Sequence, residues 1–331
     1  MYSVHSMLGL RQGKIEFVGT GSIKKSVLIE DNDLFIDGNV RTLSYADFII
    51  EKGHEDCLIL FFDYLKSFQE KWTCAELCEI PENQFTLSYL SQLSNKTNSI
   101  YKCLHIPLPS SYETFLRGIK HKDRKEMRRY LRRIEKRDFK IELIDCSDSS
   151  SISLGMNRLF ELNQRRWHSK GLPSAFDDPL LCSFYLDIPN SFSNNKTLGL
   201  FCLRLSGKTV SVLFGFKYKG KYCVYETGMD PKYSCFSVGN FLFLKVIEKC
   251  IQEGLLEFDF MLGTDPYKLQ FNPCEKRTCE PIVPNKWLLG ALTSSLFSKY
   301  WQQGLRLKNF HRKYLERKRS LCTPSCRYPQ E

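Results

Sequence analysis

Residues 198–226 read LGLFCLRLSGKTVSVLFGFKYKGKYCVYE, a sequence with three apolar runs. Two short breaks separate the runs, Ser206 with Gly207 and Lys219 with Gly220. Two-residue separators that contain glycine are typical of tight hairpin turns. The sequence therefore predicts a meander of three antiparallel strands, over residues 198–205, 209–216 and 222–226.

A helix and a further strand follow the meander. Apolar spacing predicts a helix over residues 238–252 and a strand over residues 256–262. A strand–helix–strand crossover makes its two strands parallel and places a ligand site at their carboxyl ends. The helix begins around Ser237, Val238 and Gly239, so its free amides are expected to point into that site, where they suit a phosphate. A plain helix cap is the other interpretation of this turn.

The chain before the meander mixes expected strands and helices. Strands are predicted over residues 14–19, 26–31 and 73–80, and helices over residues 55–72 and 153–170. A length of 331 residues corresponds to about two domains. We expect an α/β protein (α+β, mixed sheet) divided into residues 1–112, a basic helix at 113–138, a domain at 139–286 and a basic helical tail at 287–331.

Positive charge is concentrated in two of these segments. Residues 117–137 hold eleven Lys and Arg against three acids, and residues 299–319 hold eight against one, in a chain with a net charge of +11. In the first segment, Met127, Tyr130 and Ile134 form an apolar stripe at helical spacing. Two interpretations stay open: helices with solvated basic faces, or a groove for a polyanion such as coenzyme phosphates, tRNA or an anionic membrane surface.

The composition excludes several classes of protein. The longest apolar runs, such as residues 57–62 and 210–216, are far shorter than the roughly 18 residues of a membrane-spanning helix. The first ten residues lack the basic head and apolar stretch of a signal peptide, so a cytoplasmic location is expected. The fourteen cysteines are scattered without a C-x-x-C pair, which favours free thiols over a zinc site.

One segment resembles a known family. Residues 258–268, FDFMLGTDPYK, resemble the D-F-x-x-G-x-[DE]-x-Y-K signature of the CelD-like (BioF-like) acetyltransferases in the GNAT (GCN-related N-acetyltransferase) superfamily. Further segments are similar to the family in order and spacing: KDRKEMRRYLRR (122–133), LNQRRWHSKGLP (162–173), MDPKYSCFSVGNFL (229–242), IEFVGTG (15–21) and SYADF (44–48). The resemblance covers about residues 15 to 318.

The resemblance implies a fold and an activity. The fold would be two GNAT-like halves joined by the basic helix, with the first half degenerate. The activity would be acyl transfer from acetyl-CoA or another acyl-CoA, as co-substrate and without a metal, to an amine of a small-molecule or glycan acceptor. The amine would attack the thioester directly within a ternary complex. A backbone N–H on the strand over residues 222–228 would polarise the thioester carbonyl.

The same resemblance assigns roles to individual residues. Pyrophosphate would lie on the amides of the cofactor-binding turn: Ser237, Val238, Gly239 and Asn240. Three residues are expected to be catalytic: Asp259 as a positioning group or base, Glu226 as a second candidate base, and Tyr267 as an acid for the leaving thiolate. Five more are candidates for substrate binding: Asp265, Lys268, Arg166, Trp167 and Arg124.

Plainer interpretations of these residues remain. Asp259 fits a structural carboxylate bonded to a neighbouring loop, and Tyr267 fits a packed aromatic ring. Asp265 before Pro266 fits a helix N-cap. Lys268 fits a solvated lysine, and Arg166 with Trp167 fits a helix that docks on the protein.

Two other functions are compatible with the sequence. An aminoacyl-tRNA-dependent transferase, like the Fem-type enzymes that build peptidoglycan bridges on a paired GNAT-like fold, would use the basic helix at residues 117–137. A catalytically inactive protein of this fold would bind only a partner or an anionic membrane, through the basic segment at residues 299–319. The sequence does not determine the oligomeric state.

Overall fold

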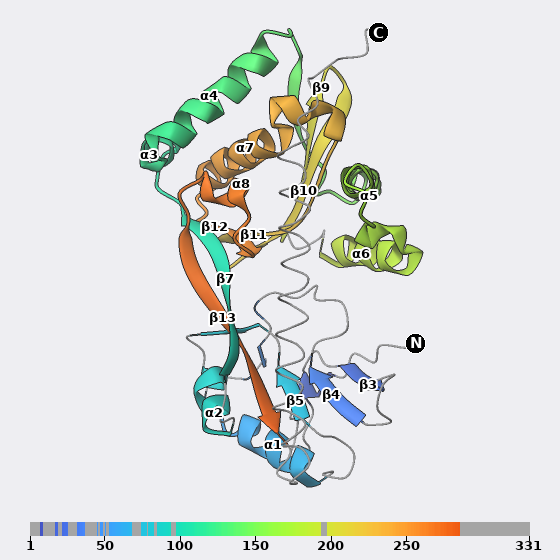
Figure 1. Cartoon of the computed structure of the whole chain (residues 1–331), viewed down its shortest axis with the longest axis vertical. Helices are drawn as coiled ribbons and strands as arrows, with labels where there is room; N and C mark the ends of the chain where they lie inside the picture. Colours follow the sequence, from blue (N-terminus) through green and yellow to red (C-terminus); the bar gives the residue numbers. More distant parts are fainter. Residues whose placement is uncertain are drawn as a thin grey trace. The chain divides into compact units, whose positions relative to one another are not determined.

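The computed structural model describes residues 97–192 and 197–284 throughout. Before residue 97 it describes shorter stretches only: 7–8, 17–18, 22–25, 32–36, 45, 47–48, 50, 53–67, 74–77, 79–82 and 85–93. The chain divides into two compact units (Figure 1). Unit 1 contains Met1–Tyr101 and Lys276–Glu331, and unit 2 contains Lys102–Glu275. The expected boundaries at residues 112, 138 and 286 stay a prediction.

The described part of unit 1 contains a separate two-stranded sheet, formed by its first two strands, further strands of a mixed sheet, and two helices. The described strands are β1 (Met7–Leu8), β2 (Phe17–Val18), β3 (Ser22–Lys25), β4 (Asn32–Ile36), β5 (Cys74–Leu77), β6 (Ile80–Pro81) and the distal part of β13 (Cys274–Pro284). β4 pairs with β3 antiparallel and with β5 in parallel, and β13 pairs with β5 and β6. The helices are α1 (Cys57–Ser67) and α2 (Phe85–Leu93). The predicted helix over residues 55–72 is confirmed as α1. The predicted strand over 73–80 is described as two strands, β5 and β6, with a left-handed backbone at Glu79 (φ 55°) between them. Residues 26–31 lie outside the described part.

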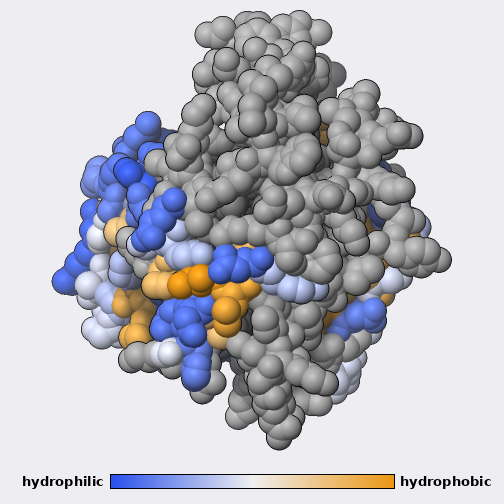
Figure 2. All heavy atoms as spheres, turned by 90° about the horizontal axis from the view of Figure 1, so that it is seen from below, coloured by the Kyte–Doolittle hydropathy of each residue, from blue (hydrophilic) through white to orange (hydrophobic). Residues whose placement is uncertain are grey.

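Some apolar side chains of α1 and α2 stay exposed. Leu58, Phe62 and Leu90 are buried in the core of unit 1, but Ile59 and Phe85 are about half exposed. Figure 2, which views the molecule from below Figure 1, shows hydrophobic residues beside hydrophilic ones on the described part of this face.

Unit 2 is built on a mixed sheet in the order β8-β9-β10-β11-β12-β7. The strands are β7 (Thr97–Pro107), β8 (Ile141–Asp145), β9 (Leu198–Leu205), β10 (Lys208–Tyr218), β11 (Lys221–Met229) and β12 (Glu257–Leu262). Neighbouring strands are antiparallel except β11 and β12, which are parallel. The predicted meander and the α/β mixed-sheet class are confirmed, and Ser206, Gly207, Lys219 and Gly220 adopt the left-handed φ values that such tight turns require.

Helices cover both faces of this sheet (Figure 1). One face carries α3 (Tyr112–Gly118), α4 (His121–Glu135), α7 (Val238–Gln252) and α8 (Pro266–Leu269), and the other carries α5 (Ile152–His168) and α6 (Pro179–Phe192). Two separate apolar clusters fill the layers. One joins Met127 and Ile134 of α4 to α7 and the sheet, and the other joins Met156 and Leu159 of α5 to α6 and the sheet.

The predicted basic helix at 113–138 is two helices. α3 begins at Ser111, whose Oγ accepts a hydrogen bond from the Thr114 amide, and α4 begins after Lys120. Ile119 between them has an extended backbone and is buried, which turns the chain before α4 starts. The basic face of α4 is exposed, while Tyr130 and the rest of its apolar stripe are buried. The expected basic helical tail at residues 287–331 lies outside the described residues.

The parallel pair β11 and β12 is held at one end by a buried aromatic contact. Tyr222 stacks on Phe258 with ring centroids 5.3 Å apart, and its hydroxyl donates to the Gly199 carbonyl at 2.9 Å. A Cβ added at Gly199 would lie 2.3 Å from the Tyr222 ring, so only glycine lets the ring cross strand β9. The small residue in β9 thus fixes the position of the large residue in β11.

This packing predicts a large effect for a small substitution. We expect Gly199→Ala to lower the free energy of unfolding by about 2 kcal/mol, because the added methyl group displaces a fully buried ring. Urea denaturation followed by circular dichroism measures the change. Gly118→Ala, where an added Cβ meets no atom within 4 Å, is the matched control and should not lose stability. An equal loss in both variants would contradict the proposed contact.

Candidate active site

A pocket opens where β11 and β12 separate. The two strands pair at only three positions, Lys221 to Cys223 with Glu257 to Asp259, although β11 continues to Met229. A pocket of about 220 Å³ lies beside the unpaired part of β11. It is lined by residues of α5, β10, β11, η4 (Pro231–Phe236), α7 and α8, including Arg166, Thr227, Gly228, Met229, Ser237, Gly239, Asn240 and Tyr267. The structure therefore brings the predicted cofactor-binding turn, Arg166 and Tyr267 together.

The first turn of α7 forms one wall of the pocket. Ser237 has a left-handed backbone (φ 51°), and its side chain makes no capping hydrogen bond. The first amides of a helix have no partner within the helix, so those of α7 are available to an anion at this wall. Gly239 and Asn240 line the pocket, whereas the Val238 side chain is fully buried in the core. The Asn240 amide group donates to Gln270 Oε1 at 2.9 Å, which links α7 to the residue after α8.

The unpaired part of β11 is held from the other face of the sheet. Asn163 of α5 is buried, and its Nδ2 donates to the Thr227 carbonyl at 3.0 Å. The Ser211 hydroxyl donates to the Gly228 carbonyl at 2.9 Å. A Cβ at Gly228 would lie 2.9 Å from the Leu159 carbonyl, so glycine allows the close approach of α5. The sequence analysis missed Asn163, although an asparagine on the apolar face of a predicted helix was a usable signal.

Glu226 lies in β11 next to the residues that line the pocket. Burial raises the pKa of its carboxyl to about 7, against a smaller opposite effect of a hydrogen bond from the Thr227 amide and of the Arg166 charge. A carboxyl with a pKa near neutrality exchanges its proton readily at the pH of a cell. That property is what a general base requires.

Tyr267 packs against α7. Its ring stacks on Phe243 with centroids 5.5 Å apart, and it lines the pocket. Burial, with a smaller contribution from the Asp265 charge, raises the pKa of its phenol well above the usual value. The phenol therefore keeps its proton at neutral pH and can donate a hydrogen bond.

Asp259 is buried inside β12 and does not line the pocket. Its side chain is only 1% exposed, and its Oδ1 accepts a hydrogen bond from the Met261 amide at 2.7 Å. Met261 has a left-handed backbone (φ 58°), and the pairing of β12 with β7 shifts register at this point. The carboxylate thus stabilises an irregularity that bends the end of β12.

Lys268 is buried, and its cationic group faces backbone carbonyls. Its Nζ donates to the carbonyls of Phe260 at 3.1 Å, Leu262 at 2.6 Å and Gly263 at 3.3 Å, and lies 3.6 Å from Asp265 Oδ2. Burial lowers its pKa. Asp265 precedes α8, which begins with Pro266, but its side chain makes no capping hydrogen bond. Lys268 therefore ties the end of β12 to the first turn of α8.

The remaining predicted binding residues are dispersed. Arg166 lines the pocket, but its neighbour Trp167 is partly exposed, with Lys170 Nζ 4.9 Å from its ring centre. Arg124 on α4 donates to the carbonyls of Leu116 at 3.3 Å and Arg117 at 3.5 Å, which end α3. Neither Trp167 nor Arg124 lines the pocket.

Two further kinds of feature are absent from the described part of the chain, a metal site and a membrane-spanning helix. No group of three or more His, Cys, Asp or Glu side chains there is arranged to hold a metal ion. No helix there is both long and apolar enough to cross a membrane.

Comparisons with known proteins point to a fold family. Residues 121–269, from α4 to α8, match the family described as "Acetyltransferase (GNAT) domain". The chain is similar to the solved structure of FemX, with a TM-score of 0.58, 13% identity, and coverage of 84% of this chain and 87% of that chain. It is also similar to a structure described as the C-terminal domain (DUF2156) of a lysylphosphatidylglycerol synthetase from Agrobacterium fabrum, with a TM-score of 0.51, 13% identity and coverage of 84% and 88%.

These comparisons show a GNAT-like fold and a match of residues 121–269 to the GNAT acetyltransferase domain. Both structural matches extend beyond residues 121–269, which agrees in part with an architecture of two halves. At 13% identity they show the fold alone. No curated protein matches the chain. The assignment to the CelD-like subfamily stays a prediction.

The pKa of Glu226 predicts a pH-dependent stability. The folded state keeps the Glu226 proton up to about pH 7, whereas an unfolded glutamate releases it near 4.5, so stability falls as pH rises through this window. Glu226→Gln has no proton to release. Between pH 4.5 and 7.5 we expect the variant to gain about 2 kcal/mol of unfolding free energy relative to wild type.

Urea denaturation at several pH values measures this difference. Glu113→Gln, which alters an exposed carboxyl on α3, is the control and should follow the wild-type profile. Parallel profiles for wild type and Glu226→Gln would show that Glu226 ionises like an exposed glutamate.

Proposed function

Because residues 121–269 carry a GNAT acetyltransferase domain, we propose that the protein is an N-acyltransferase that moves an acyl group from acyl-CoA to an amine. One observation carries the proposal. The gap between β11 and β12, the uncapped first turn of α7 and Tyr267 meet in a single pocket. Phosphate-binding amides and a proton-donating phenol thus lie around one small volume.

The donor's position follows from the pocket walls. Its pyrophosphate lies against the amides of Val238, Gly239 and Asn240, because a helix N-terminus attracts negative charge. The amide of Ser237, which the sequence also assigns to the pyrophosphate, already donates to the Ser234 carbonyl at 3.0 Å. The acyl group then extends into the gap beside β11. Directly after β11, the Asp230 amide donates to the Val210 carbonyl of β10. Successive residues of an antiparallel strand point their main-chain groups to opposite sides, so the Met229 amide points away from β10 and towards the gap. We assign the polarisation of the thioester carbonyl to this amide.

The proton steps use Glu226 and Tyr267. The acceptor amine forms an N–C bond with the thioester carbon and releases a proton, which Glu226 accepts directly or through water. The C–S bond then breaks and the electron pair leaves on sulfur. Tyr267, which keeps its proton, donates a hydrogen bond to that sulfur. Arg166, which lines the pocket, is a candidate to hold an anionic part of the acceptor.

The contacts of the other signature residues favour a shaping role. Asp259 stabilises the bend of β12 through the Met261 amide, and Lys268 holds the carbonyls that follow it. Asp265 lies beside the Lys268 ammonium group. We propose that these three residues keep β12 and α8 apart from β11, so that the gap stays open, and that they do not touch the reacting atoms.

An aminoacyl-tRNA is the second candidate donor. The likeness to FemX over 84% of the chain favours it, because Fem-type enzymes use that donor on this fold. The exposed basic face of α4 provides charge for phosphate contacts. The likeness to a domain of a lysylphosphatidylglycerol synthetase suggests a lipid headgroup as a further candidate acceptor. For the same reason we retain the proposal that the protein contacts an anionic membrane peripherally. A cytoplasmic location stays a prediction.

Coenzyme binding tests the proposed donor. We expect acetyl-CoA to bind at one site in isothermal titration calorimetry at moderate salt. Gly239→Glu should abolish binding, because its carboxylate would lie where the pyrophosphate is proposed. Gly239→Ala is the matched control and should bind normally, since a Cβ there meets only Met229 Sδ at 3.6 Å. If acyl-CoA does not bind and tRNA binds with an affinity that falls steeply as salt rises, the proposed donor is wrong and aminoacyl-tRNA takes its place.

Thiol release tests the role of Tyr267. We expect Tyr267→Phe to lower kcat by about tenfold to a hundredfold with little change in KM, because the lost hydrogen bond forms mainly as sulfur leaves. A thiol-reactive dye measures release of coenzyme A. Tyr130→Phe, a buried tyrosine on α4, is the control and should keep the wild-type rate. Unchanged turnover in Tyr267→Phe would remove the phenol from the mechanism.

A further inference from the structure

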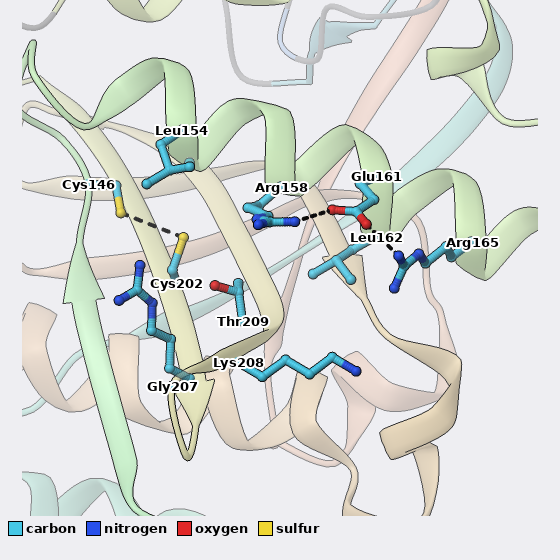
Figure 3. A pocket seen from close by; sticks show the side chains of 12 residues that line it. Cys146, Leu154, Arg158, Glu161, Leu162, Arg165, Cys202, Gly207, Lys208 and Thr209 are labelled. Atoms are coloured by element: carbon cyan, nitrogen blue, oxygen red, sulfur yellow. Dashed lines mark hydrogen bonds and ion pairs between the residues drawn. The ribbon is translucent and has the colours of Figure 1, made fainter.

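A second pocket lies on the other face of the sheet. It has a volume of about 420 Å³ and lies between α5 and the β9–β10 hairpin. Figure 3 shows Arg158, Glu161 and Arg165 of α5 along one side and Lys208 and Thr209 of β10 across from them. None of the residues that line this pocket lines the proposed coenzyme pocket. The two pockets are therefore separate.

Positive charge dominates the lining. Four cationic side chains and one acidic side chain line the pocket: Arg158, Arg165, Arg204, Lys208 and Glu161. Glu161 is shared, because its Oε2 accepts from Arg158 Nη1 at 2.7 Å and its Oε1 accepts from Arg165 Nη2. One carboxylate cannot neutralise two guanidinium groups.

Arg204 has unused hydrogen-bonding capacity. Its Nε is buried and has no hydrogen-bond partner within the described chain. It lies in β9 opposite Glu142 of β8, whose pKa is lowered mainly by Lys140 and only slightly by Arg204. A buried N–H without an acceptor costs free energy, and a ligand oxygen in the pocket would remove that cost.

Asp230 reduces the charge only in part. It is buried behind the pocket, with Oδ2 3.4 Å from Lys208 Nζ and 3.6 Å from Arg165 Nη1. These ion pairs are not hydrogen bonds, and that oxygen has no hydrogen-bond partner among the described residues. Even with Asp230 counted, the cations exceed the acids by two. Lys208 and Arg165 can therefore turn to an anion in the pocket.

The far end of the pocket is weakly polar. Cys146 and Cys202 meet there with their sulfur atoms 3.6 Å apart, and Leu154 lies beside Cys146 (Figure 3). Walls of low polarity screen charges weakly, so the attraction between the cations and an anionic ligand is stronger there than in water. A hollow with excess positive charge and an unpaired guanidinium N–H suits a compact anion that accepts several hydrogen bonds.

We propose that this pocket binds the phosphate group of a small phosphorylated molecule. Arg158, Arg204 and Lys208 contact the phosphate oxygens from three sides, and Glu161 orients the two arginines of α5. The proposal does not depend on the donor used at the other pocket. The two pockets are nevertheless linked through Asp230. Its carboxylate accepts a hydrogen bond from the Lys232 amide and so holds η4, the segment that leads to Ser237 at the coenzyme pocket.

Pyrophosphate binding to the full chain tests the proposal. The titration uses Gly239→Glu protein, in which the first turn of α7 is blocked, so that the proposed coenzyme pocket does not contribute. We expect one binding site by calorimetry. Arg158→Gln, Arg204→Gln and Lys208→Gln, each added to this background, should weaken binding by about tenfold, the effect of losing one charge-assisted hydrogen bond. Arg158 and Lys208 are half exposed, so their variants should fold.

Lys221→Gln is the matched control. Lys221 is also about half exposed and also pairs with a glutamate, Glu257 at 3.5 Å, but it lies at the start of β11 and lines neither pocket. It should leave pyrophosphate binding within twofold of the parent. Absence of binding, or an equal loss in Lys221→Gln and Lys208→Gln, would overturn the proposal, since the second result indicates attraction by net charge alone.

Discussion

The site depends on the parallel contact of β11 and β12 being short. Two parallel strands normally continue side by side and close the sheet. Here the contact is limited to three positions by features on both strands. Tyr222 and Phe258 stack at the paired end, and directly after it Asp259 stabilises the left-handed Met261, which bends β12. The sheet therefore opens at the end where α7 begins.

An open edge in a sheet exposes main-chain groups, and this structure holds them from outside the pair. Asn163 bonds the carbonyl of Thr227, and Lys268 bonds three carbonyls at the end of β12. Buried side chains thus replace the hydrogen bonds that the neighbouring strand would have made. The gap is consequently a fixed feature, and a ligand that enters it meets main-chain groups already in place.

Local sequence predicted the parts of this arrangement that local physics determines. The turns at Ser206 and Lys219, the strands between them and α7 follow from glycine positions and apolar spacing. The roles of the α7 turn and Tyr267 follow from the resemblance to a known family. Prediction from sequence fails where burial decides: the sequence predicts a ligand-binding or solvated Lys268, but this side chain is buried against carbonyls that β12 presents only after its bend. Asn163 and Arg204 owe their positions to contacts between distant segments, which spacing does not encode.

The nature of the donor is decided outside the small pocket. Coenzyme A and tRNA both carry phosphates, and both must place a reactive carbonyl in the same gap, so the inner residues suit either. Outside the pocket, the surface offers a larger hollow. It has a volume of about 580 Å³, lies between α4 and α8, and its cationic lining residues are Lys120, Lys122, Lys125 and Arg129. Part of the charge of α4 is already used, because Arg133 donates to the Cys235 carbonyl at 3.0 Å and so holds the segment before the first turn of α7. The lysines at the start of α4 remain at the hollow, and a donor that contacts them must extend beyond the pocket, so the length of the donor's phosphate-bearing part determines whether α4 contributes to binding.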